Sequence, residues 1–124
     1  MARPREFSET EVLHSAIATF GAQGFNALSV DTLLKKVGLN RSSFYKIYGS
    51  KHGLFQAALT RVCELAAEGK TDDHSEDFIL IALTELAPSH PDIRKLAKKA
   101  VTLCFNDCPT LLGHHLLIRA GLTP

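Results

Sequence analysis

Hydrophobic residues recur at helical spacing along most of this 124-residue chain. In residues 29–38 they fall three or four positions apart, which places them on one face of a helix. These apolar positions are Val30, Leu33, Leu34 and Val37. Ser29 precedes them as a candidate N-cap, and Gly38 follows them, where a glycine adopts a left-handed conformation at little cost. The pattern predicts a short helix between these two residues.

A second short helix is predicted over residues 41–48, with Asn40 as its N-cap. Phe44 and Tyr48 lie four residues apart and share the inner face of this helix. The side chains expected mostly on its outer face are polar or aromatic: Arg41, Ser42, Ser43, Tyr45 and Lys46. Two short helices joined by a glycine-containing turn, the second with such an outer face, are typical of a helix-turn-helix. Double-stranded DNA is therefore the expected partner.

The segments on either side of this pair each predict a further helix. Residues 8–11 have the spacing of a capping box, and the apolar stripe after them is expected to end at Gly21 and Gly24. After the pair, Ser50 is a candidate cap for a long linking helix. That helix is expected to stop before the polar, turn-rich residues 69–75.

Three apolar stretches make up the rest of the chain. The first is expected to begin at Ser75 and end at Pro88, and it is apolar almost all round, as in a buried helix. The second begins near Pro91 and is stopped or kinked at Pro109, and residues 111–122 form a short final helix. The sequence therefore predicts an all-α protein of six or seven helices.

The composition is that of an ordinary globular protein, with 45% hydrophobic and 22% charged residues. No apolar run is long enough to span a bilayer and no signal-like segment opens the chain, so no membrane partner is expected. The three cysteines (Cys63, Cys104 and Cys108) are odd in number and unevenly spaced. They argue against a disulfide framework and favour a reducing compartment, so a cytoplasmic location is expected.

The net charge of +1 is too small to indicate a nucleic-acid partner, but the charges are unevenly distributed. Residues 1–56 carry seven Lys or Arg against four Asp or Glu, a net of +3, and the remaining residues carry seven against nine. Positive charge thus collects in the half with the helix-turn-helix, as phosphate contacts require. Arg3 and Arg5, in the arm of residues 1–7, are further candidates for weak phosphate contact.

The helix-turn-helix also carries a family resemblance. The segment GLNRSSFYKIYGSKHGLF, residues 38–55, resembles the signature of TetR/AcrR-type transcriptional repressors. The resemblance extends upstream through TFGAQGFNALSVDTLLKKVGL and covers about residues 7–59, close to half of the chain. It implies an all-α protein with a three-helix DNA-binding head, a linking helix and a helical C-terminal lobe.

The resemblance also implies roles for individual residues. Arg41, Ser42 and Lys46 would face base edges, and Tyr45 and Lys51 would hold phosphates. Ser29 would add a contact to the DNA backbone, while Phe44 and Tyr48 would set the depth of the recognition helix. The DNA-binding residues expected by this comparison and by the outer-face pattern are Ser29, Arg41, Ser42, Ser43, Tyr45, Lys46 and Lys51.

Two features depart from the family pattern. Ile47 stands where many relatives have a polar residue such as histidine, which leaves a phosphate contact missing there. The chain after Glu68 is much shorter than the usual regulatory domain, so a small-molecule effector within one subunit is doubtful. The expected organisation is a DNA-binding domain over residues 1–50 and a linking helix with a short regulatory or dimerisation lobe over residues 51–124.

The final helix favours self-association. It holds more apolar surface than a short lobe can easily bury: Leu111, Leu112, Leu116, Leu117 and Ile118. Pairing with the same patch of a second copy would cover it, and a two-fold DNA site calls for a two-fold protein. The expectation is a homodimer that binds a palindromic operator and represses transcription.

Other interpretations are weaker. A shortened relative could instead be an interaction module that dimerises or sequesters partners without sensing a ligand. The aromatic residues of the second short helix could be core residues alone, but this leaves the exposed basic face unexplained. The cysteines and the pair His114 and His115 lack the usual metal-ligand spacings, so no metal, cofactor or thiol switch is expected. No catalytic motif is present, and an enzyme is not expected.

Overall fold

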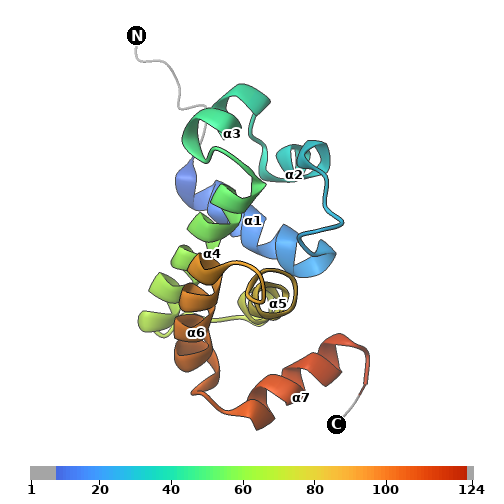
Figure 1. Cartoon of the computed structure of the whole chain (residues 1–124), viewed down its shortest axis with the longest axis vertical. Coiled ribbons are helices and arrows are strands. Elements are labelled where there is room, and N and C mark those ends of the chain that lie inside the picture. The colour runs from blue at the N-terminus through green and yellow to red at the C-terminus, as the bar shows by residue number, and fades with distance from the viewer. Residues whose placement is uncertain (1–7, 123–124) are drawn as a thin grey trace.

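The computed structural model describes residues 8–122, which form helices and turns with no strand among them (Figure 1). The helices are α1 (Glu9–Gln23), α2 (Val30–Val37), α3 (Arg41–Ile47), α4 (Lys51–Ala67), α5 (Asp73–Ile81), the π-helical turn η1 (Ala82–Leu86), α6 (Pro91–Phe105) and α7 (Pro109–Arg119). The predicted all-α class is confirmed. The arm with Arg3 and Arg5 lies outside the described residues.

The first helix does not end at Gly21, contrary to the sequence expectation. Gly21 is buried inside α1, and the helix runs on to Gln23, with Gly24 as its C-cap at φ 84°. A Cβ atom on Gly21 would lie 3.1 Å from the backbone nitrogen of Phe78 and 3.2 Å from the backbone oxygen of His74. The missing side chain therefore lets α5 pack closely against α1.

An aromatic cluster occupies the centre of the molecule. Phe55 of α4 packs edge-on against Phe20 of α1, with ring centroids 4.9 Å apart, and stacks on Phe78 of α5 at 4.4 Å. Phe25, in the loop after α1, contacts Phe55 edge-on at 5.5 Å. Phe20, Phe55 and Phe78 are fully buried. One core therefore joins residues on both sides of the expected boundary at residue 50, and that division stays a prediction.

The α5 helix begins earlier than the sequence suggested. The N-cap of α5 is Asp72 and not Ser75. The Oδ1 atom of Asp72 accepts a hydrogen bond of 2.9 Å from the Ser75 amide. Asp72 lies three residues earlier in an extended conformation, which directs its carboxylate at this free amide. Ser75 itself is buried in the first turn.

The end of the helix that was expected to stop at Pro109 also differs from expectation. Helix α6 ends at Phe105, before Pro109, because Asn106 and Asp107 both adopt positive φ values. Cys104 and Cys108 therefore do not share a helical face. Burial raises the pKa of the Cys104 thiol to about 11, which keeps this sulfur in its unreactive protonated form.

The last helix is held to α5 by charged groups. His115 of α7 is buried, and its two ring nitrogens lie 3.1 Å from Glu76 Oε1 and 2.8 Å from Asp77 Oδ1. Arg119 adds a contact of 3.2 Å to the same Asp77 oxygen. Burial raises the pKa of the Glu76 carboxyl. These contacts fix α7 so that Leu112 packs against the core while Leu111, Leu116 and Leu117 are exposed. None of the described helices combines the length and apolar character needed to cross a bilayer.

Candidate nucleic-acid interface

Helices α2 and α3 form a compact unit at one end of the molecule (Figure 1). Gly38 closes α2 in the left-handed conformation, with φ 73°, and its amide donates to the Leu34 carbonyl. Leu39, in the turn, is buried. The Asn40 side chain then caps α3 by accepting a 2.8 Å hydrogen bond from the Ser43 amide. Both caps and the inward turn residue agree with the helix-turn-helix read from the sequence.

The inner side of α3 anchors this helix to the protein. Phe44 has no exposed surface, and Tyr48, which follows the helix as its C-cap, packs partly buried against the same core. Burial raises the pKa of the Tyr48 hydroxyl. Phe44 also meets the ring of Tyr45 edge-on at 4.9 Å. The expected division into an inner and an outer side of α3 is present.

The outer side of α3 presents four of the predicted DNA-binding residues to solvent together. Arg41, Ser42, Tyr45 and Lys46 are all exposed, whereas Ser43 is half-buried. Tyr45 exposes 47% of its surface although it is a large aromatic residue. An aromatic side chain combined with a guanidinium, an ammonium and a hydroxyl can contact both phosphates and base edges in a DNA groove.

The guanidinium of Arg41 forms an ion pair with Asp31 in the first turn of α2. Both side chains are exposed, so the pair adds little to folding stability. Its effect is to hold Arg41 across the turn between the two helices. An approaching DNA phosphate or base would compete with Asp31 for this guanidinium.

Ser29 is engaged as the N-cap of α2. Its hydroxyl oxygen accepts from the Thr32 amide at 3.1 Å, and the hydroxyl lies 3.0 Å from Thr32 Oγ1. The residue is nevertheless exposed at the start of the helix, where backbone amides favour negative charge. Its predicted contact with DNA is untested by this geometry.

Lys51 is turned inward, away from the position expected of a freely exposed phosphate ligand. Its Nζ donates to the carbonyl oxygens of Phe25 at 2.7 Å and Leu28 at 2.9 Å, and it lies 4.4 Å from the centre of the Phe25 ring. Burial lowers the pKa of this ammonium, and the nearby Glu85 carboxylate opposes that shift. Two of its three hydrogens are thus used within the protein. A phosphate contact through the third stays a prediction.

Glu85 completes a clamp on the same loop, a role that the sequence analysis missed. Its Oε1 accepts hydrogen bonds from the amides of Phe25, at 2.9 Å, and Asn26, at 2.8 Å. The residue belongs to the π-helical turn after α5, sixty positions away from Phe25 in the chain. No local pattern links two residues so far apart. Lys51 and Glu85 together fix the loop that leads from α1 into α2.

We expect Lys51→Met to destabilise the chain by about 1–3 kcal/mol, because two loop carbonyls would lose a charged donor. Urea unfolding followed by circular dichroism measures this change. The matched control is Lys46→Met on the exposed side of α3, which should change the free energy of unfolding by about 0.5 kcal/mol at most. Equal stabilities of the two variants would contradict the clamp.

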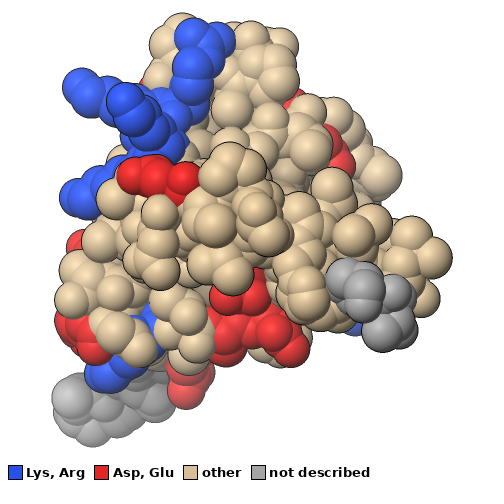
Figure 2. Space-filling view, turned by 90° about the horizontal axis from the view of Figure 1, so that it is seen from below, with Lys and Arg blue, Asp and Glu red and all other residues tan. Residues whose placement is uncertain are grey.

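Basic residues are not confined to the end with α2 and α3. Figure 2 views the molecule from the opposite end, and Lys and Arg side chains gather along one edge of it. Exposed basic residues of α6 lie in this half of the fold: Arg94, Lys95, Lys98 and Lys99. The charge bias counted along the sequence is therefore weaker support for a DNA partner than the exposed face of α3.

Comparisons with known proteins agree on the N-terminal part of the chain. Residues 12–58 match the family model described as bacterial regulatory proteins, tetR family. The chain is 41% identical over 64 residues to the HTH-type transcriptional regulator YezE of Bacillus subtilis, and 39% identical over 57 residues to the HTH-type transcriptional repressor BdcR of Escherichia coli. These segments cover 52% and 46% of this chain but only 33% and 29% of the relatives. No solved structure gives a significant match.

Proposed function

Because residues 12–58 belong to the tetR family of bacterial regulatory proteins, we propose that this chain binds a palindromic DNA operator as a homodimer and represses transcription. The family resemblance in residues 38–55 is confirmed by this match. The observation that carries the proposal is the exposed outer side of α3, where a large aromatic ring lies beside basic and hydroxyl side chains. Repression is proposed because one relative is named a repressor.

Within this proposal the residues of α3 have different tasks. Arg41, Ser42 and Lys46 read base edges, since guanidinium, hydroxyl and ammonium groups can donate to them. The hydroxyl of Tyr45 donates to a phosphate. Ser43 is half-buried, so its only contact with DNA is with the DNA backbone, at the edge of the helix. Ser29 and the third hydrogen of Lys51 lie at helix starts, where phosphates are favoured.

The homodimer is proposed to form through α7. Its exposed apolar residues are Leu111, Leu116, Leu117 and Ile118, followed by Leu122. The same helix carries a shallow, mostly apolar hollow, which is lined by Thr110, Gly113, His114, Leu116 and Leu117. A second copy of this helix offers apolar side chains that would fill the hollow and be covered in return, as an isologous interface requires.

DNA binding should depend strongly on salt and on α3. We expect Arg41→Ala to weaken operator binding by about 1–3 kcal/mol and to relax base preference at one position. Tyr45→Phe, which keeps the ring on Phe44, should weaken binding to all sequences alike by about 0.5–1.5 kcal/mol. Fluorescence anisotropy with a base-substitution series, repeated at several salt concentrations, measures both effects, and Lys98→Ala on α6 is the control.

Two results would contradict these assignments. Identical behaviour of the Arg41 and Tyr45 variants across the base series would show that the division between reading and positioning is wrong. No binding to any genomic fragment at low salt would contradict DNA binding altogether, because phosphate contacts are strongest there. That result would favour the second candidate, an interaction module, which the exposed apolar residues of α7 also suit.

A further inference from the structure

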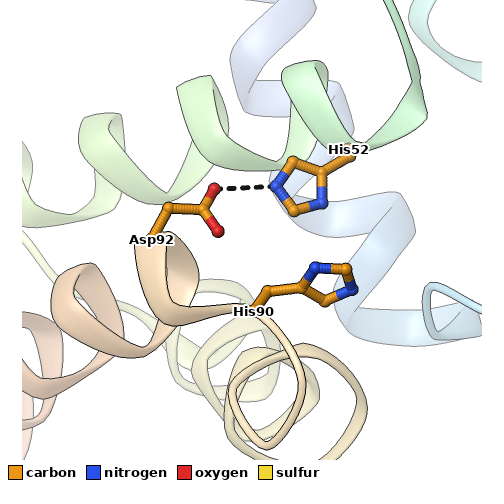
Figure 3. A group of neighbouring side chains, drawn as sticks. All are labelled: His52, His90 and Asp92. Carbon is orange, nitrogen blue, oxygen red and sulfur yellow. Dashed lines mark hydrogen bonds and ion pairs between the residues drawn. The ribbon is translucent and has the colours of Figure 1, made fainter.

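Three potential metal ligands converge where α4 meets the start of α6 (Figure 3). His52 lies in the first turn of α4, His90 is the residue that precedes α6, and Asp92 lies in the first turn of α6. The side chains of His52 and Asp92 point toward one another, the His90 ring lies beside that of His52, and one nitrogen or oxygen atom from each residue lies within 4.8 Å of the others. His52 and His90 are half-buried, and Asp92 is exposed.

We propose that His52, His90 and Asp92 bind one divalent transition-metal ion, with water completing its coordination. Two imidazole nitrogens and one carboxylate oxygen suit Zn²⁺, Co²⁺ or Ni²⁺, which accept nitrogen and oxygen ligands together. Mg²⁺ and Ca²⁺ prefer oxygen ligands alone and would bind poorly. No other part of the proposed function requires these three side chains.

The contacts between the three side chains are close to those of a metal site. His52 Nε2 lies 2.7 Å from Asp92 Oδ2, and the rings of His52 and His90 meet edge-on with centroids 4.7 Å apart. An ion bound to His52 Nε2 would take the place of the hydrogen shared with Asp92, and in the neutral imidazole this hydrogen would move to Nδ1. Gln56, one turn further along α4, donates to the same Asp92 oxygen at 3.2 Å and orients the carboxylate.

The backbone that carries His90 and Asp92 is held in place before any ion binds. Arg94 donates from Nε to the Ala87 carbonyl at 2.9 Å and from Nη2 to the Pro88 carbonyl at 3.1 Å. The His90 amide donates to the Leu86 carbonyl at 2.9 Å, and Pro91 fixes the first position of α6. Ligands on such a fixed segment lose little conformational entropy when they bind an ion.

An ordinary ion pair explains this cluster only in part. The hydrogen bond between His52 and Asp92 accounts for those two residues, but among the described residues no hydrogen bond involves the His90 ring. Another acid–histidine cluster within residues 8–122 differs in this respect. There both ring nitrogens of His115 contact carboxylates, and Arg119 compensates their charge, so that cluster is explained by its own ion pairs.

A bound ion would connect the C-terminal lobe to the helix that follows α3. His52 is adjacent to Lys51, which clamps the loop into α2, and Ile47 ends α3 four positions before Lys51. Holding α4 against α6 would therefore restrict how α3 is presented. An effect of the ion on DNA affinity rests on the proposed function, whereas ion binding itself does not.

The test is calorimetric titration of untagged, full-length protein with Zn²⁺ in the absence of DNA. We expect one ion per chain and an upward shift of the melting temperature. His90→Gln should weaken binding about tenfold or more. The matched control is His115→Gln, which should leave it unchanged, and Co²⁺ absorption should lack the intense bands of thiolate ligands.

Each other outcome would overturn the site. One such outcome is that Zn²⁺ shows no saturable binding, and another is that the His90 variant binds Zn²⁺ as tightly as the native chain. A third is that Zn²⁺ binding is lost in the His115 variant or in a variant with all three cysteines changed to serine. His90→Gln removes no hydrogen bond within the described residues and loses only the edge-on contact with the His52 ring, so its folding should be intact, and circular dichroism checks this. DNA titrations with and without Zn²⁺ then test the connection to α3 separately.

Discussion

Phe55→Ala is expected to destabilise the chain by about 3–5 kcal/mol and to lower its melting temperature by roughly 10 °C or more. Phe55 is fully buried and packs against Phe20, Phe25 and Phe78. The truncation would leave a cavity between three helices that are each fixed by other contacts. The surrounding side chains can close only part of it, so the transfer and cavity costs add.

The same variant tests whether the two halves fold as one unit. Because the ring joins α1, α4 and α5, its loss should lower the stability of the whole chain in a single transition. Circular dichroism and tyrosine fluorescence, recorded during urea unfolding at one protein concentration, should give coincident curves, since both tyrosines lie in α3 or directly after it. Ile47→Ala is the control, because this side chain is 45% exposed and should cost far less. Two separate transitions would contradict a shared core.

Leu117→Glu is expected to convert a homodimer into monomers at micromolar concentration. Leu117 is 40% exposed on α7, among other apolar side chains. In the proposed interface each glutamate would lose its water without gaining a partner, and the two-fold axis would introduce the charge twice. A cost of several kcal/mol raises the dissociation constant by more than about 100-fold.

Sedimentation equilibrium over a range of concentrations measures this dissociation. The control is Lys98→Glu, which introduces a carboxylate on the exposed side of α6 and should leave the dimer unchanged. The monomeric Leu117 variant should also lose most of its operator affinity, since one head covers only half of a palindrome. A native chain that sediments as a monomer, or a Leu117 variant that stays dimeric, would show that α7 is not the interface.

The sequence by itself determined the all-α class and most of the helix-turn-helix. Helical periodicity, the caps at Ser29 and Asn40 and the left-handed Gly38 act within a few residues, so each can be read from neighbouring positions. The exposure of Arg41 and Lys46 followed from the same periodicity, because Phe44 fixes which side of α3 is buried.

Only the tertiary structure decided which functional groups meet across the chain. Gly21 reads as a helix end, but it lies within α1 because α5 needs the space of its missing side chain. The sequence suggests that Lys51 is a free phosphate ligand, but its ammonium donates hydrogen bonds to two carbonyl oxygens of the loop after α1. His52 and Asp92 are forty positions apart and come together because α6 packs on α4. Such contacts depend on the packing of whole helices, which no local sequence pattern records.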